Sequence, residues 1–145
     1  AALIVIVPAA WSLHHITSSN TTRSRISDVR AISRAVDRHT HKGEVVMAFW
    51  PGYIYESDVR QIPGLENDFA PSAVFNTHLS AARAAEYHML STPEMFEAIR
   101  SHKVRLIIFG RGNANRGIRW RRFMLAAGYR PIERVRDATL FALGE

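Results

Sequence analysis

The sequence predicts an α/β fold, a three-layer Rossmann-like sandwich whose sheet is mostly parallel and ends in an antiparallel hairpin. Apolar runs of strand length alternate with segments whose apolar residues recur at helical spacing. The run 45–50 is continuously apolar, which suits a central strand covered on both faces, and 104–109 is predicted to be a second central strand. The strands predicted over 129–135 and 139–143 are separated by three residues, and so short a link makes them antiparallel.

Helices are predicted over 27–41, over 79–90, from 91 onwards and over 118–127. Gly43 and Gly128 stand where a left-handed residue ends a helix. Ser91 followed by Glu94 is the pattern of a reciprocal capping box. Between the first helix and the second we expect a short helix or turn, a weak strand near 60–62 and a long loop.

Composition fits one globular domain and leaves the class of partner open. The chain has 145 residues, 47% of them hydrophobic, and a net charge of +6. It has no cysteine, which excludes disulfides, thiolate zinc sites and a cysteine nucleophile. Six cationic and two acidic residues fall in 1–42, five and eight in 43–110, and eight and three in 111–145. The ends are therefore basic and the middle is acidic, which permits an anionic partner.

The first segment does not resemble the rest of the chain. Residues 1–13 are uncharged and almost wholly apolar, but a membrane-spanning helix needs about 20 such residues. We interpret 1–15 as the end of a truncated transmembrane helix, 16–25 as a polar linker and 26–145 as a soluble α/β domain. The alternative is that 3–7 forms a buried strand of the domain itself.

A glycine-rich, basic loop, 110–117, follows the strand predicted over 104–109. Backbone N–H groups between a strand and a helix can hold a phosphate, and the candidate residues are Gly110, Arg111, Gly112 and Asn113. Asn115 stands where a dinucleotide fingerprint requires glycine. The other interpretation is a solvated turn.

Two further groups of charged residues have both a functional and a structural interpretation. The arginines of 116–122 can face nucleic acid, anionic lipid head groups or only water. The carboxylates of the 53–71 stretch can bind a divalent cation, can act as a general acid and base, or can be solvated loop residues. The seven histidines show no metal-binding spacing, so no metal site and no cofactor are predicted.

Three segments carry a resemblance to a known family: Trp50-Pro51-Gly52-Tyr53, Pro63-Gly64-Leu65-Glu66-Asn67 and the strand over 104–109, after an apolar end and a polar linker. Together they resemble the C-terminal soluble domain of polytopic glycosyltransferases of the GT-C fold group, similar to dolichyl-phosphate-mannose protein mannosyltransferases and aminoarabinose transferases. The resemblance implies an accessory domain on the extracytoplasmic (periplasmic) side of the cell membrane, beside a membrane portion that takes sugar from a polyprenyl-phosphate donor. The family's catalytic acid lies in the membrane region, so no catalytic residue is carried over to this chain.

On this interpretation the partners are the membrane portion of the same polypeptide, a lipid-linked sugar or acceptor, and anionic lipid head groups, while nucleic acid is disfavoured. The binding residues expected in the contact surface are Trp50, Tyr53, Glu56, Arg60, Glu66 and Asn67. Six basic residues over 23–42 favour the cytoplasmic side by the positive-inside tendency, but long domains translocate with little regard for charge. The alternative function is a stand-alone α/β enzyme that binds a nucleotide or phosphate with its 110–117 loop.

Overall fold

The computed structural model describes residues 26–66, 80–110 and 114–144. In chain order they form α2 (Ile26–His39), β1 (Val45–Ala48), the 3₁₀ helix η1 (Pro51–Ile54), β2 (Arg60–Gln61), α4 (Ala81–Glu86), α5 (Thr92–Arg100), β3 (Leu106–Gly110), α6 (Ala114–Ala126), β4 (Tyr129–Val135) and β5 (Ala138–Leu143). The predicted transmembrane end and linker lie outside the described residues. Within the described ranges, no helix is both long and apolar enough to cross a membrane.

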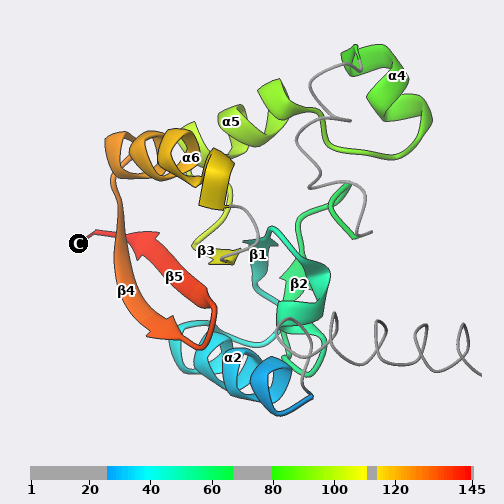
Figure 1. Ribbon diagram of the computed structural model, residues 1–145. Coiled ribbons are helices and arrows are strands. Elements are labelled where there is room, and N and C mark those ends of the chain that lie inside the picture. Colours follow the sequence, from blue (N-terminus) through cyan, green and yellow to red (C-terminus); the bar gives the residue numbers. More distant parts are fainter. Residues whose placement is uncertain (1–25, 67–79, 111–113, 145) are drawn as a thin grey trace, which may run out of the picture.

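One mixed sheet of five strands, in the order β2-β1-β3-β5-β4, forms the centre of the fold (Figure 1). The pairs β1–β2 and β1–β3 are parallel, whereas β3–β5 and β4–β5 are antiparallel. The α/β class and the C-terminal hairpin are confirmed. The expectation of a mostly parallel sheet is wrong, because the tight turn after Val135 returns β5 antiparallel to β3 and so makes half of the pairings antiparallel.

Alternate residues of the central strands pack into two hydrophobic clusters. Met47 and Ile107 belong to the cluster that includes residues of α5 and α6, whereas Val46 and Ile108 belong to the cluster formed with α2 and η1. This is the period-two alternation of a strand with both faces covered. Figure 1 shows α2 on one side of the sheet and α5 and α6 on the other.

The predicted helix ends are largely confirmed. Gly128 (φ 92°), two residues after α6, has the left-handed backbone that ends a helix, and its N–H donates to the carbonyl of Leu125. Gly43 (φ 77°) is also left-handed, but α2 already ends at His39, and the N–H of Gly43 donates to the carbonyl of Asp58. The side chain of Ser91 accepts from the N–H of Glu94, and the carboxylate of Glu94 accepts from the N–H of Ser91. These bonds satisfy donors that the first turn of α5 otherwise leaves unpaired.

Three element boundaries differ from the sequence-based expectation. The strand expected over 45–50 ends at Ala48, because the chain turns into η1 at Pro51. The helix expected over 79–90 is limited to α4, and His88 after it has a positive φ of 52°. The last helix begins at Ala114 rather than residue 118, so half of the predicted 110–117 loop is helical.

The amide of Gln61 extends the short edge strand β2. Its Oε1 accepts from the N–H of Ala48 at 2.9 Å, and its Nε2 donates to the carbonyl of Ala48 at 2.6 Å and to that of Leu65 at 3.0 Å. Ile62, the residue just after β2, donates from its N–H to the carbonyl of Val46. A side chain therefore pairs the last backbone groups of β1 where the neighbouring strand has ended.

Replacing Gln61 by Ala should lower the free energy of unfolding by about 1–3 kcal/mol, since the backbone of buried Ala48 loses its partners. Gln61→Glu should also destabilise, because a carboxylate can accept from Ala48 but cannot donate to its carbonyl. Urea unfolding followed by circular dichroism measures both. Wild-type stability in both variants would contradict this role of the amide.

Candidate functional site

The strongest candidate site is the edge of the sheet where β1 and β3 end, which we call the carboxyl edge. β1 leads through η1 towards β2, on the side of α2, whereas β3 leads into α6 on the opposite face. Such a divergence of neighbouring parallel strands is the topological switch point at which open α/β sheets bind ligands. Trp50, Tyr53 and Gly110, all predicted from the sequence, lie at this edge.

Tyr53 occupies the carboxyl edge with its ring. The side chain is 5% exposed, and its hydroxyl donates to Oδ2 of Asp137, in the β4–β5 turn, at 2.9 Å. A Cβ on Gly110 would come within 2.8 Å of ring carbons of Tyr53 and still closer to its hydroxyl. The ring of Trp50 packs edge-on to that of Tyr53, with centroids 4.9 Å apart. Gly110 is therefore required by the packing of Tyr53.

The start of α2 closes the same edge. Buried Ser33 donates to the carbonyl of Tyr53 at 3.1 Å, which ties η1 to the helix. The Nε of Arg30 lies 3.0 Å from Oε1 and 3.1 Å from Oε2 of Glu56. Arg136 pairs with Asp28 at 3.2 Å. The charged side chains thus link α2 to η1 and to the hairpin turn.

Other residues of the predicted binding set lie elsewhere. Arg60 donates to the carbonyl of Gly43, at the opposite end of β1 from Trp50. Glu66 accepts from the N–H of Gly64, two residues before it. Asn67 and the phosphate candidates Arg111, Gly112 and Asn113 lie outside the described residues. The structure therefore groups Trp50, Tyr53 and Glu56 and separates Arg60 and Glu66 from them.

Glu66 borders an open hollow of about 500 Å³ between the turn at 63–66 and the α4–α5 connection. Its wall is formed where the N–H of Leu90 donates to the carbonyl of Gly64 at 2.9 Å. The second carboxylate of the hollow, Glu94, is the capping residue of α5. Both acids thus accept from backbone N–H groups, which makes them supports of these turns.

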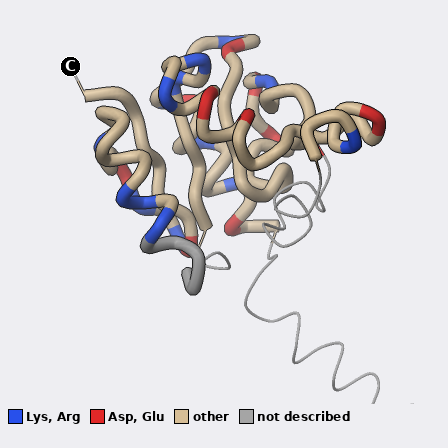
Figure 2. The backbone as a smooth tube through the Cα atoms, turned by 90° about the horizontal axis from the view of Figure 1, so that it is seen from above, with Lys and Arg blue, Asp and Glu red and all other residues tan. Residues whose placement is uncertain are grey.

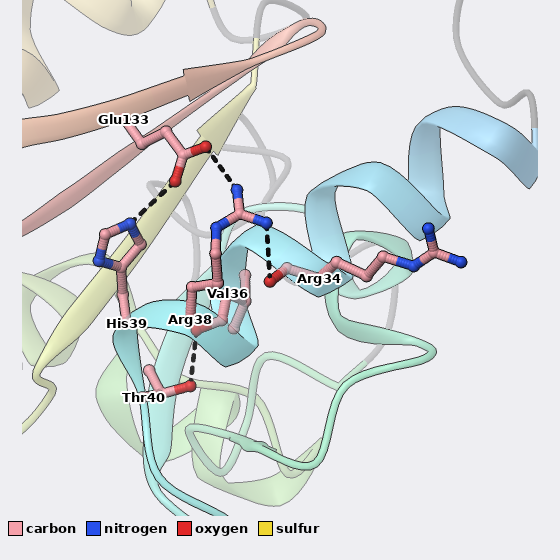
Figure 3. Close-up of polar contacts among 6 residues, drawn as sticks. All are labelled: Arg34, Val36, Arg38, His39, Thr40 and Glu133. Carbon is pink, nitrogen blue, oxygen red and sulfur yellow. Dashed lines mark hydrogen bonds and ion pairs between the residues drawn. The ribbon is translucent and has the colours of Figure 1, made fainter.

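The end of α2 is fastened to β4 by a three-residue ionic cluster (Figure 3). Arg38 donates from Nη2 to Oε1 of Glu133 at 2.6 Å, and Nε2 of His39 lies 2.8 Å from Oε2. The hydrogen bond from His39, with a further contribution from Arg38, lowers the pKa of Glu133 below its usual value. The cluster stabilises the ionised carboxylate and holds the helix against the edge strand.

Tyr129, at the start of β4, is fully buried, and its hydroxyl donates to the carbonyl of Val104 at 2.5 Å. Burial raises the pKa of this phenol to about 12 because the phenolate would lose its hydration. The group therefore remains a neutral hydrogen-bond donor near pH 7.

The sequence interpretation missed Ser33 and Asp137. Both are common residue types without a motif, and their roles depend on contacts with Tyr53 that span 20 and 84 positions. The serine sits on the apolar stripe of α2 between Ile32 and Val36, and a polar residue there was the available signal.

Comparison with known proteins adds no assignment: no family model, no characterised protein and no solved structure matches the chain. In the ranges that the structure describes, no three or more His, Cys, Asp or Glu residues form a group that could hold a metal ion. The described residues of the carboxyl edge take part in aromatic packing and in ion pairs formed within the fold.

Gly110→Ala should destabilise the protein by about 1–3 kcal/mol through overpacking against Tyr53. In a Tyr53→Leu background the same change should cost less than about 1 kcal/mol, because the crowding ring is gone. Gly144→Ala is the matched control, since the nearest atom to a Cβ there is 3.5 Å away. If the loss of unfolding free energy in the double variant equalled the sum of the losses in Gly110→Ala and Tyr53→Leu, the packing argument would be contradicted.

Glu133→Gln should lower the unfolding free energy near pH 7 by about 0.5–1 kcal/mol. Because folding depresses the carboxylate pKa, its contribution is present above the ordinary value of 4.5 and is lost as pH falls through the folded-state value. Unfolding curves of variant and wild type should therefore converge in acid. The exposed pair Glu97–Arg100 gives the control Glu97→Gln, with a change within about 0.5 kcal/mol. A Glu133→Gln effect that persisted undiminished in acid would be inconsistent with this origin.

Proposed function

We propose that this domain is an accessory, extracytoplasmic domain of a polytopic glycosyltransferase that uses a polyprenyl-phosphate sugar donor, and that its carboxyl edge faces the membrane portion. In this role the domain shapes access of the acceptor and leaves the chemistry to the membrane region. The observation that carries the proposal is the position of Tyr53, whose ring fills the place where α/β enzymes bind ligands.

The polar groups around Tyr53 also support a structural role. Glu56 is paired with Arg30, and the carboxylate of Asp137 accepts from the tyrosine hydroxyl. A general acid or base must instead reach a proton of the substrate. An edge whose carboxylates pair with neighbouring segments suits a preformed docking surface better than a catalytic cleft.

The orientation follows from where α2 begins and what lies beside it. The apolar run and polar linker of the sequence precede Ile26, the first residue of α2, which is 66% exposed. Tyr55, directly after η1, is 83% exposed, and the next residue, Glu56, is paired with Arg30 one turn along α2 from Ile26. Amphipathic rings favour the level of lipid head groups. These residues suit the face turned towards the membrane portion.

The proposed domain has a Rossmann-like three-layer arrangement. Helices on both sides of the sheet, with β2-β1-β3 parallel, support a Rossmann-like three-layer arrangement in which the C-terminal hairpin replaces further parallel strands. The diverging ends of β1 and β3 are the part of that arrangement that Tyr53 fills.

In the complete membrane enzyme, the double variant Ile26→Ser/Tyr55→Ser should reduce sugar transfer severalfold, because the docking face loses its apolar side chains. The matched control Tyr87→Ser/Ile132→Ser removes one tyrosine and one isoleucine, 52% and 41% exposed, from the position just after α4 and from β4. It should keep wild-type transfer. Both variants should keep the wild-type melting temperature, since all four side chains are exposed.

Two results would overturn the proposal. The first is that the membrane enzyme carrying Ile26→Ser/Tyr55→Ser transfers sugar at the wild-type rate and that the isolated chain also catalyses sugar transfer. The other is a nucleotide that raises the melting temperature of the isolated chain, since a ligand at about 100 times its Kd adds roughly 2.7 kcal/mol of stability. That second result would favour a stand-alone nucleotide-binding protein.

A further inference from the structure

α6 presents a cationic face to solvent. Arg119, Arg121 and Arg122 are exposed, whereas Trp120 and Met124, on the other side of the helix, are buried in the core. The helix contains no Asp or Glu. Figure 2 marks the basic positions in blue, and those of α6 follow one another along the helix. The arrangement is amphipathic, with every charge of one sign.

The acids that the structure describes do not pair with these arginines. Some arginines on other elements are paired, namely Arg30 with Glu56, Arg38 with Glu133 and Arg136 with Asp28, whereas Arg34 and Arg83, each on a different helix, have no ion pair among the described residues. Within the described part of the chain, no ion pair involves the exposed arginines of α6. Arg130, just beyond the helix, donates to the carbonyl of Leu125 and places a further positive charge at its C-terminal end. The face keeps its attraction for an external anion.

The position of α6 connects this face to the carboxyl edge. β3 ends at Gly110 and α6 begins at Ala114, so the helix starts at the edge where β3 ends. The start of α2 lies at the same edge, because Asp28 pairs with Arg136 and Ala138 pairs with Gly110 across the sheet. α2 and α6 thus both begin at this edge, on opposite faces of the sheet, and Arg119, Arg121 and Arg122 follow in the second and third turns of α6.

We propose that Arg119, Arg121 and Arg122 bind the phosphate groups of an anionic phospholipid surface. Guanidinium groups suit phosphate because their planar donors match its oxygens. Each basic residue close to an anionic leaflet contributes about 1 kcal/mol, a factor of roughly five in affinity. The inference deepens the proposed function, since it names the lipid that the domain meets beside the membrane portion.

Lipid fits this face better than nucleic acid does. Single-stranded nucleic acid is held by aromatic rings on which bases stack, together with a basic groove. The rings of α6 are already engaged: Trp120 is 6% exposed and stacks on Phe96 at 4.5 Å, and Phe123 packs edge-on to the same ring at 4.4 Å. The exposed apolar residues near the edge, Ile26 and Tyr55, are instead suited to a lipid interface.

The test compares sedimentation of the chain with vesicles of phosphatidylcholine alone and with vesicles that also contain phosphatidylglycerol. The anionic vesicles should bind more chain, and raising the salt from about 0.1 M to about 1 M should abolish the difference, since the Debye length falls from about 10 Å to 3 Å. Arg119→Gln/Arg121→Gln/Arg122→Gln should reduce the preference for anionic vesicles by roughly a hundredfold.

The matched control, Arg34→Gln/Arg83→Gln/Lys103→Gln, removes the same charge from exposed positions on other elements. It should keep most of the preference. Equal losses in the two triple variants would overturn the inference, because net charge alone would then explain binding. Equal binding of the chain to neutral and anionic vesicles would also overturn the inference. So would single-stranded RNA that displaces the chain from the vesicles and binds it more tightly than they do.

This outcome is distinguishable from that of the proposed function. The triple variant of α6 leaves Ile26 and Tyr55 intact, and vesicle binding requires no sugar transfer. Suppose that the chain shows no preference for anionic vesicles but Ile26→Ser/Tyr55→Ser still impairs sugar transfer by the membrane enzyme. That combination refutes the lipid contact alone. If the chain instead prefers anionic vesicles but Ile26→Ser/Tyr55→Ser leaves sugar transfer unchanged, the docking role alone is refuted.

Discussion

The packing of Tyr53 across Gly110 is the constraint on which the carboxyl edge depends. The ring lies on the last residue of β3, its hydroxyl binds Asp137 in the hairpin turn, and its carbonyl accepts from Ser33 of α2. One residue therefore joins the sheet, the hairpin and a covering helix. Because it needs a residue without a side chain beneath it, the end of β3 has little freedom to vary. The end of β3 at the carboxyl edge is consequently filled by a side chain of the fold itself.

Local signals in the sequence predicted much of the fold. The capping box of Ser91 and Glu94 and the helix-ending Gly128 depend on bonds within a few residues, so their patterns are readable without knowledge of the rest of the chain. The hairpin was equally predictable, because a short connection allows only antiparallel neighbours. The proportion of parallel strand pairs was not predictable, since it depends on which strand lies next to β5 on the side away from β4.

The candidate site was predictable only in part, because its contacts join distant positions. The sequence predicted one binding set of six residues, and the structure keeps only its nearest neighbours in the chain, Trp50, Tyr53 and Glu56, in one place, whereas Arg60 and Glu66 bond elsewhere. Asp137 follows Tyr53 by 84 positions, and nothing local marks it as a partner. Gln61 was similarly inconspicuous, although its amide replaces a missing stretch of β2. Such roles arise from tertiary placement, which leaves no spacing pattern in the chain.

The uneven charge of the sequence acquires a structural explanation in the fold. Acids of the middle block pair with cations of the first block, as Glu56 does with Arg30 and Asp58 with Lys42, so part of the basic N-terminal charge is neutralised internally. The arginines of α6 have no acid on their own helix, and excess positive charge therefore collects on one face. Long-range attraction from such a face orients a domain before contact, whereas exposed apolar side chains act only at contact. In the proposed membrane contact, the arginines of α6 act during approach, and the exposed side chains of Ile26 and Tyr55 act once contact is made.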